Sequence, residues 1–205
     1  MRPPANELGD TRSGLLFALA AYGIWGIVPI YFVWVSFAQP LEVVAHRVVW
    51  GIPLLGLLLL ASGQWRSIKS LAPSAFGYLL VSALCLSINW LTFIYAVQTE
   101  RIAEASLGYF INPLVSIVLG WLFLREQLRP LQWLAVALAL VGVCSELWVR
   151  TNLPWLGLTL ALSFGLYGLL RKQVNVGAVV GLSIETAVVA PFAIGFLFWL
   201  SLQGD

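Results

Sequence analysis

Long runs of apolar residues, interrupted by short polar segments, extend along almost the whole chain. About 20 mainly apolar residues are enough for a helix to cross a hydrocarbon core of roughly 30 Å, and a helix satisfies its own backbone N–H and C=O groups there. The pattern therefore predicts an all-α polytopic membrane protein with seven transmembrane helices. The expected helices cover 14–36, 43–62, 75–97, 104–124, 130–149, 154–171 and 182–202.

The composition supports this prediction. Of the 205 residues, 60% are hydrophobic and 10% are charged, whereas an ordinary soluble domain carries roughly 25% charged residues. These values exclude a soluble enzyme domain, a disordered tail and a nucleic-acid-binding module. The sequence has a single histidine, and it shows no metal-ligand cluster, nucleophile motif or phosphate-binding loop. We expect no enzyme activity, metal or cofactor.

The positions of Lys and Arg predict the orientation in the membrane, because cytoplasmic loops retain positive charge during insertion. With the N-terminus inside, eight basic residues fall on the cytoplasmic side, against Arg101 and Arg150 outside. Arg47 lies within the second helix near its outer end. The segment 1–13 is therefore expected in the cytoplasm. The eight basic residues are Arg2, Arg12, Arg66, Lys69, Arg125, Arg129, Arg171 and Lys172.

A short motif occurs twice and indicates an internal repeat. Gly-x-aromatic-Gly is found at 23–26 and at 165–168, and Glu42 and Glu185 open the following helices at nearly the same offset. Chance is the alternative interpretation, since the motif is short. A true repeat would have five helices, and an odd number inverts the second copy, as in many secondary transporters.

The repeat predicts the domain organisation. The first five-helix repeat is expected at 14–150, and 154–205 is expected to be the start of the inverted second repeat. About three further helices are then expected after Asp205 in a complete pair of repeats.

The fourth predicted helix has a stripe of small and polar residues. Gly108, Asn112, Ser116 and Gly120 recur every four residues and share one face. Such a stripe either packs closely against another helix, which is favoured for the glycines, or lines a polar cavity. Pro113 removes a helical hydrogen bond and predicts a kink, which suits a substrate pathway and equally a bent helix.

Other helices also offer polar or aromatic residues to a central cavity. Asn89 shares a helix face with Ser82 and Cys85, and an amide there either bonds a neighbouring helix or contacts a ligand. Trp25 lies too deep in the first helix for an interfacial aromatic residue. Its ring is expected either to stack on an organic substrate or to pack in the core.

Ionisable residues gather at the start of the second helix. Glu42 and His46 are four residues apart on one face, and Arg47 follows. They form either a capped helix end with a snorkelling Arg47 or an outer gate and proton-coupling group. Solvated or capping roles are expected for three glutamates near helix ends, and a loop contact for Glu126. The three are Glu104, Glu146 and Glu185.

The residues from 104 to 120, with the core Ala-Ser-Leu-Gly-Tyr-Phe-Ile-Asn-Pro-Leu-Val, resemble the RarD family of EamA transporters. Ala-His-Arg-Val at 45–48, Asn-Trp-Leu at 89–91 and Ser-Phe-Gly-Leu-Tyr-Gly-Leu at 163–169 are similar to that family as well. The resemblance covers roughly 13–200. It implies a ten-helix transporter of the bacterial cytoplasmic membrane with two inverted five-helix repeats. RarD members are usually labelled chloramphenicol-sensitivity or resistance permeases, and a chain that ends after seven helices departs from the family pattern.

The hypothesis is a secondary transporter that exports a small organic metabolite or drug by alternating access. A non-transporting seven-helix receptor or scaffold subunit is the alternative. The expected partners are a small-molecule substrate, membrane lipid and a second copy in a homodimer, with no nucleic acid. The expected substrate-pathway residues are Trp25, Asn89, Tyr109, Asn112 and Tyr167, with Glu42, His46 and Arg47 as gate or proton-coupling residues.

Overall fold

A computed structural model describes residues 5–69, 71–149, 153–174 and 176–204. The chain divides into two compact units, Met1–Phe37 and Ala38–Asp205. The first unit contains a single described helix, α1 (Ala5–Trp34), with Pro29 inside it. This helix begins nine residues before the expected start at 14, because the polar N-terminal residues continue the helix of the apolar run.

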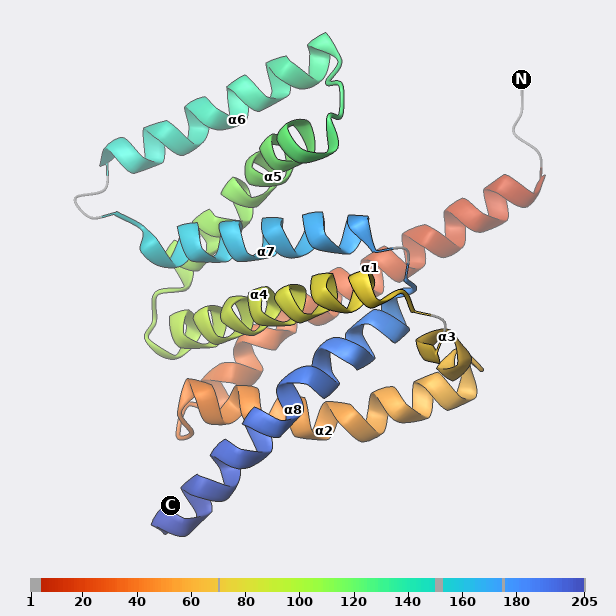
Figure 1. The fold of residues 1–205 in the computed structure, drawn as a ribbon. Helices are drawn as coiled ribbons and strands as arrows, with labels where there is room; N and C mark the ends of the chain where they lie inside the picture. Colours follow the sequence, from red (N-terminus) through yellow and green to blue (C-terminus); the bar gives the residue numbers. More distant parts are fainter. Residues whose placement is uncertain (1–4, 70, 150–152, 175, 205) are drawn as a thin grey trace. The chain divides into compact units, whose positions relative to one another are not determined.

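The second unit is helical throughout its described part (Figure 1). Pro40 and Pro73 open two of its helices, in the position where a missing N–H costs nothing. Gly204 ends the last helix with a φ of 83°, which glycine adopts without strain. The helices are α2 (Pro40–Ala61), α3 (Trp65–Lys69), α4 (Pro73–Gln98), α5 (Ile102–Leu124), α6 (Pro130–Val149), α7 (Trp155–Gln173) and α8 (Ala178–Gln203).

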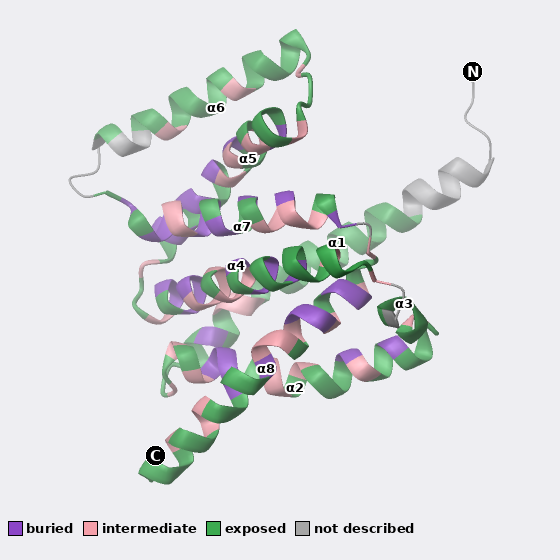
Figure 2. Cartoon of the chain, viewed as in Figure 1, coloured by how far each residue is buried: buried purple, intermediate pink, exposed green. Residues whose placement is uncertain are grey.

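In this unit, α7 packs along both α4 and α5, and α8 packs on α2 and α4. The buried positions in Figure 2 gather on α4, on α7 and on the first half of α8, whereas α6 is almost entirely exposed. One apolar cluster joins α5 to α7 through Leu107, Ile111 and Ala161. A second cluster joins α2, α4 and α8 and includes Leu79 and Ile184.

The contact between α5 and α7 is close because two glycines face each other. A Cβ atom built on Gly108 would lie 2.6 Å from the carbonyl oxygen of Gly157, and one built on Gly157 would lie 2.8 Å from the carbonyl oxygen of Glu104. Both distances are shorter than ordinary van der Waals contact. This confirms close packing for Gly108, whereas Asn112 and Ser116 on the same stripe stay half-buried or exposed.

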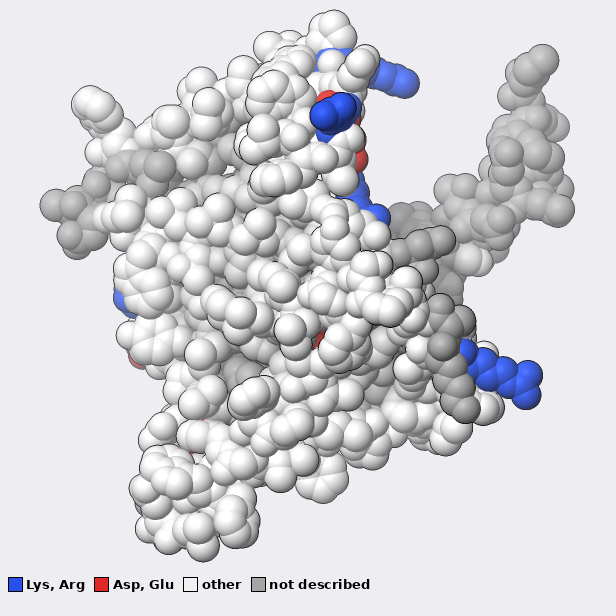
Figure 3. Space-filling view, in the orientation of Figure 1, with Lys and Arg blue, Asp and Glu red and all other residues white. Residues whose placement is uncertain are grey.

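Large apolar side chains remain on the outside of these helices. Phe110 is 71% exposed and Trp50 is 72% exposed, and the face in Figure 3 is almost free of charge apart from small groups of charged side chains. Five helices in the described residues are long and apolar enough to cross a membrane: 13–34, 40–61, 73–98, 102–124 and 178–203. The chain is therefore a multi-pass all-α membrane protein, while the number of seven spans and the repeat stay predictions.

Two differences from the sequence analysis matter for the site. A short helix, α3, occupies part of the segment between the predicted helices 43–62 and 75–97. The last helix begins at Ala178, four residues before the predicted start at 182. This earlier start places Glu185 two turns inside α8 instead of at its end.

Candidate functional site

A cluster of ionisable and hydroxyl side chains lies where α4, α7 and α8 meet, with Glu185 and Ser82 buried and Tyr167 and Arg171 half-buried. Glu185 of α8 is only 2% exposed. Ser82 of α4 donates a hydrogen bond to its Oε1 at 2.5 Å, and the Nε of Arg171 from α7 lies 3.9 Å from the same oxygen. The Tyr167 phenol interacts with both Glu185 and Arg171. We call Ser82, Tyr167, Arg171 and Glu185 the buried polar cluster.

The shape of α8 decides where the Arg171 guanidinium lies. The guanidinium packs directly on Gly181, and any Cβ atom at that position would overlap it. Its Nη2 also lies 3.4 Å from the carbonyl oxygen of Val176 and 3.5 Å from that of Gly177. Arg171 therefore folds back over the connection between α7 and α8, whereas the adjacent Lys172 points outward and binds Glu126 at 3.0 Å.

Two atoms of the cluster have no hydrogen-bond partner. Nη1 of Arg171 and Oε2 of Glu185 are fully buried and unpartnered among the described residues. Buried polar atoms are nearly always hydrogen-bonded in folded proteins. Within its described residues, the cluster thus keeps a donor nitrogen and an acceptor oxygen without partners, which suits a group that binds transiently.

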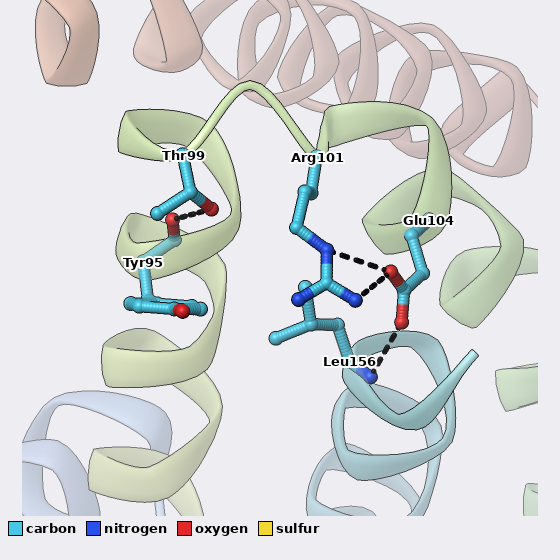
Figure 4. A network of polar contacts seen from close by, with 5 residues as sticks. All are labelled: Tyr95, Thr99, Arg101, Glu104 and Leu156. Atoms are coloured by element: carbon cyan, nitrogen blue, oxygen red, sulfur yellow. Dashed lines mark hydrogen bonds and ion pairs between the residues drawn. The ribbon is translucent and has the colours of Figure 1, made fainter. Parts of the chain in front are cut away.

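A second buried glutamate has complete hydrogen bonding (Figure 4). Glu104 accepts from Arg101 at 3.0 Å and 2.5 Å on Oε2, and its Oε1 accepts from the backbone N–H of Leu156 at 3.0 Å. The last contact caps the free N–H groups at the start of α7. The expected capping role is therefore observed, but the carboxylate caps the neighbouring helix and not its own.

The expectation for Glu185 was wrong. A solvated or capping role was predicted because the residue lies near the end of the predicted span, yet its side chain is buried inside α8. Sequence reasoning also missed Arg171 and Ser82 as members of a site. The available signal was a carboxylate within an apolar helix, since charge at membrane depth is costly and usually has a function. Glu146 lies among residues whose side chains fall outside the described part of the structure.

Asn89 joins two helices. Its Nδ2 donates to the carbonyl oxygen of Leu160 and to Oγ of Ser163, both at 3.0 Å. Of the two roles left open for this residue, the structure shows the bond to a neighbouring helix. Because α4 carries Ser82 and α7 carries Tyr167 and Arg171, Asn89 supports a helix pair that contributes to the buried polar cluster.

The remaining predicted pathway residues are spread out. Tyr109 is half-exposed, with its ring 6.1 Å from that of Phe93. Asn112 lies 3.5 Å from Ser116 within α5, and Pro113 follows it inside the same helix. Trp25 belongs to the separate unit of α1 and is 43% exposed. Of the five predicted residues, the structure thus brings only Tyr167 into the buried polar cluster.

The three predicted gate residues all lie on α2 but take part in two separate contacts. Glu42 and His46 face each other at 4.0 Å, and the His46 side chain is largely exposed. Arg47 turns toward α4, where its guanidinium carbon lies 3.0 Å from the centroid of the Trp90 ring. This cation–π contact ties α2 to α4 and gives Arg47 a packing role.

The model of the EamA-like transporter family matches residues 12–145. The chain belongs to the EamA-like transporter family. Among the relatives of this EamA-like chain, a Vibrio cholerae protein named an uncharacterized transporter is 46% identical over 94% of the chain. Protein RarD of Escherichia coli K12 is 48% identical over 92% of it. A Pseudomonas aeruginosa protein named chloramphenicol-sensitive protein RarD is 37% identical over 91%. The chain spans 64% of the length of each of these three relatives. No solved structure matches it.

Proposed function

We propose that the protein is a secondary transporter that exports a small organic solute across the bacterial cytoplasmic membrane by alternating access. The observation that supports this most is the buried polar cluster, because ionisable groups within apolar helices are expensive and usually mark a substrate or ion pathway. Membership of the EamA-like family supports the same function. The proposal gives the chain no catalytic role.

In this proposal, the pathway runs along the α4–α7 interface. Tyr167 reaches it from α7 and Asn89 from α4, and both helices contribute to the buried polar cluster. Tyr109 and Asn112 are proposed to contact the solute from α5, and Trp25 from α1. The cytoplasmic N-terminus and the inverted repeat belong to the same proposal.

The test is solute exchange by the full-length protein in liposomes. Radiolabelled chloramphenicol is the first probe, because one relative is named for it, followed by a panel of amino acids and organic amines. We expect at least one compound to exchange faster than in protein-free liposomes. Asn112→Ala should lower that rate by about twofold to tenfold if one hydrogen bond to the solute is lost.

The matched control is Ser145→Ala on α6, an exposed residue whose hydroxyl donates to the carbonyl oxygen of Gly142 in the same helix. It should leave exchange unchanged. If no compound of the panel exchanges above the protein-free rate, transport by this protein is refuted. If exchange occurs and Asn112→Ala equals Ser145→Ala, the pathway assignment of Asn112 is refuted while the transporter function stands.

A further inference from the structure

Two buried glutamates of this chain have opposite hydrogen-bonding states. Glu104 has a partner on each carboxylate oxygen. Glu185 is more deeply buried, at 2% exposure against 8%, but only its Oε1 has a partner. The arrangement at Glu104 is that of a structural ion pair. The arrangement at Glu185 leaves Oε2 available at a position that is closed to the surroundings in this conformation.

The pairing of Glu185 with Arg171 is also incomplete. A strong arginine–carboxylate pair has two parallel N–H···O contacts at about 2.7–2.9 Å, whereas here a single nitrogen lies 3.9 Å from Oε1. Burying two charges is costly unless good geometry and further hydrogen bonds compensate for the lost hydration. Neither compensation is present at Oε2 or Nη1. Adding one proton to Oε2 would remove the uncompensated negative charge.

A pocket lies beside the segment over which Arg171 folds back. A cavity of about 460 Å³ is lined by residues of α3, α4, the connection between α7 and α8 and the start of α8, including Ser67, Tyr78, Gly177 and Val180. The carbonyl oxygen of Gly177 also lies next to Nη2 of Arg171. Arg171, which faces Glu185, therefore also contacts a residue of the pocket lining.

From this geometry we infer that Glu185 carries the coupling proton of transport, an inference that rests on the proposed function. Oε2 of the carboxylate accepts a proton from a hydronium ion that enters through the pocket, and a water molecule is left. The carboxylate becomes a neutral acid, Arg171 keeps its charge, and the pair changes from net zero to +1. In the other conformation the acid returns the proton to water on the opposite side. The solute and the proton cross the membrane in opposite directions.

The groups around Glu185 set when it binds the proton. Arg171 and Tyr167 face it from α7, and Ser82 faces it from α4. The helices α2 and α3 also pack on α8. In the described part of the chain, no hydrogen bond or ion pair joins Glu185 to Glu42, His46, Arg47 or Arg66 of these helices. The side chain of Lys69, at the end of α3, lies outside the described part. Arg171 is the positioning residue, since its positive charge opposes protonation until it moves away.

The test separates coupling from solute binding in the full-length protein. Glu185→Gln keeps the size of the side chain but cannot take up a proton. We expect this variant to lose accumulation driven by a pH gradient by at least about tenfold and to retain solute exchange at equal pH. Wild-type protein should move protons into the lumen as solute leaves it, as followed by a trapped pH-sensitive dye. The matched control, Glu104→Gln, should affect both transport modes equally.

An infrared titration of the purified protein provides a second measurement that needs no solute. Wild-type protein should show a carboxylic-acid C=O band that titrates and that is absent in Glu185→Gln but present in Glu104→Gln. Accumulation by Glu185→Gln at the wild-type level overturns the inference, and so does the absence of such a band. Loss of both modes in folded Glu185→Gln overturns it too, because the residue would then bind solute. If wild-type protein exchanges no solute, the proposed function fails, and the infrared band still decides whether Glu185 binds a proton.

Discussion

Replacing Gly108 by alanine tests whether the close approach of α5 and α7 stabilises the fold. The new Cβ atom would lie 2.6 Å from the carbonyl oxygen of Gly157. That is about 0.7 Å inside the shortest usual C···O contact, which is about 3.3 Å. Its other neighbours are the Cα of Gly157 at 3.0 Å and the Cβ of Leu160 at 3.1 Å. Because the backbone of α7 cannot rotate away as a side chain does, the two helices must separate.

The expected magnitude follows from two opposing terms. Overpacking of a tight contact costs about 1–3 kcal/mol, while alanine stabilises a helix interior by about 1 kcal/mol relative to glycine. Gly168→Ala is the matched control, since it gains the same helix term on α7 and its Cβ atom meets nothing within 4 Å. Gly108→Ala should therefore be less stable than Gly168→Ala by about 1–3 kcal/mol.

Thermal unfolding of the purified variants in one detergent, followed by tryptophan fluorescence, measures this difference. For a chain of this length, each kcal/mol corresponds to about 2–4 °C in Tm. Gly108→Ala should thus unfold several degrees below Gly168→Ala. If the two variants have the same Tm, or if Gly108→Ala is the more stable, the glycine contact does not set the helix spacing and the reasoning is refuted.

Three further outcomes are expected. Glu104→Gln should lower the free energy of unfolding by about 1–3 kcal/mol, because Arg101 loses its charged partner. Chemical denaturation measures this loss, and a change below the error of that measurement would contradict the capping role. Arg47→Met should destabilise by about 0.5–2 kcal/mol through the lost contact with the Trp90 ring, whereas Arg66→Met, in a looser contact of 5.6 Å with the neighbouring Trp65, should have little effect in the same assay. A cysteine at Gln127 should react with a membrane-impermeant maleimide only after cells are permeabilised, and one at Thr99 should react in intact cells; the reverse result would overturn the orientation predicted from Lys and Arg.

The helices were predictable from the sequence because apolar runs of membrane length leave few alternatives. The run at 104–124 corresponds to α5, which begins at Ile102. The five-residue α3 was missed since it is too short to produce a periodic pattern. The start of α8 was placed four residues late because the end of a helix has a weak signal in a sequence.

The site was less predictable, because it depends on pairs of residues that meet only after folding. From the sequence, Arg171 and Lys172 have the same predicted role, as two cytoplasmic charges at the end of a helix. In the structure Lys172 pairs with Glu126 in an exposed position, and Arg171 turns inward onto Gly181. A glycine that leaves room for a guanidinium from another helix has no signature in a single sequence. Asn89 was easier, since an amide within an apolar helix has few possible partners.

The buried polar cluster occupies the contact between two groups of helices. On one side, α4, α5 and α7 are held together by the glycine contact, by Glu104 and by Asn89. On the other side, α8 packs along α2. Polar contacts cross between these groups through Glu185, which binds Ser82 and faces Arg171. Protonation of Glu185 would remove its attraction to Arg171 and leave a buried positive charge. The Glu185 carboxylate, which we infer carries the proton, thus also helps to hold the two groups of helices together. Proton uptake and a change in helix packing are therefore coupled through one side chain.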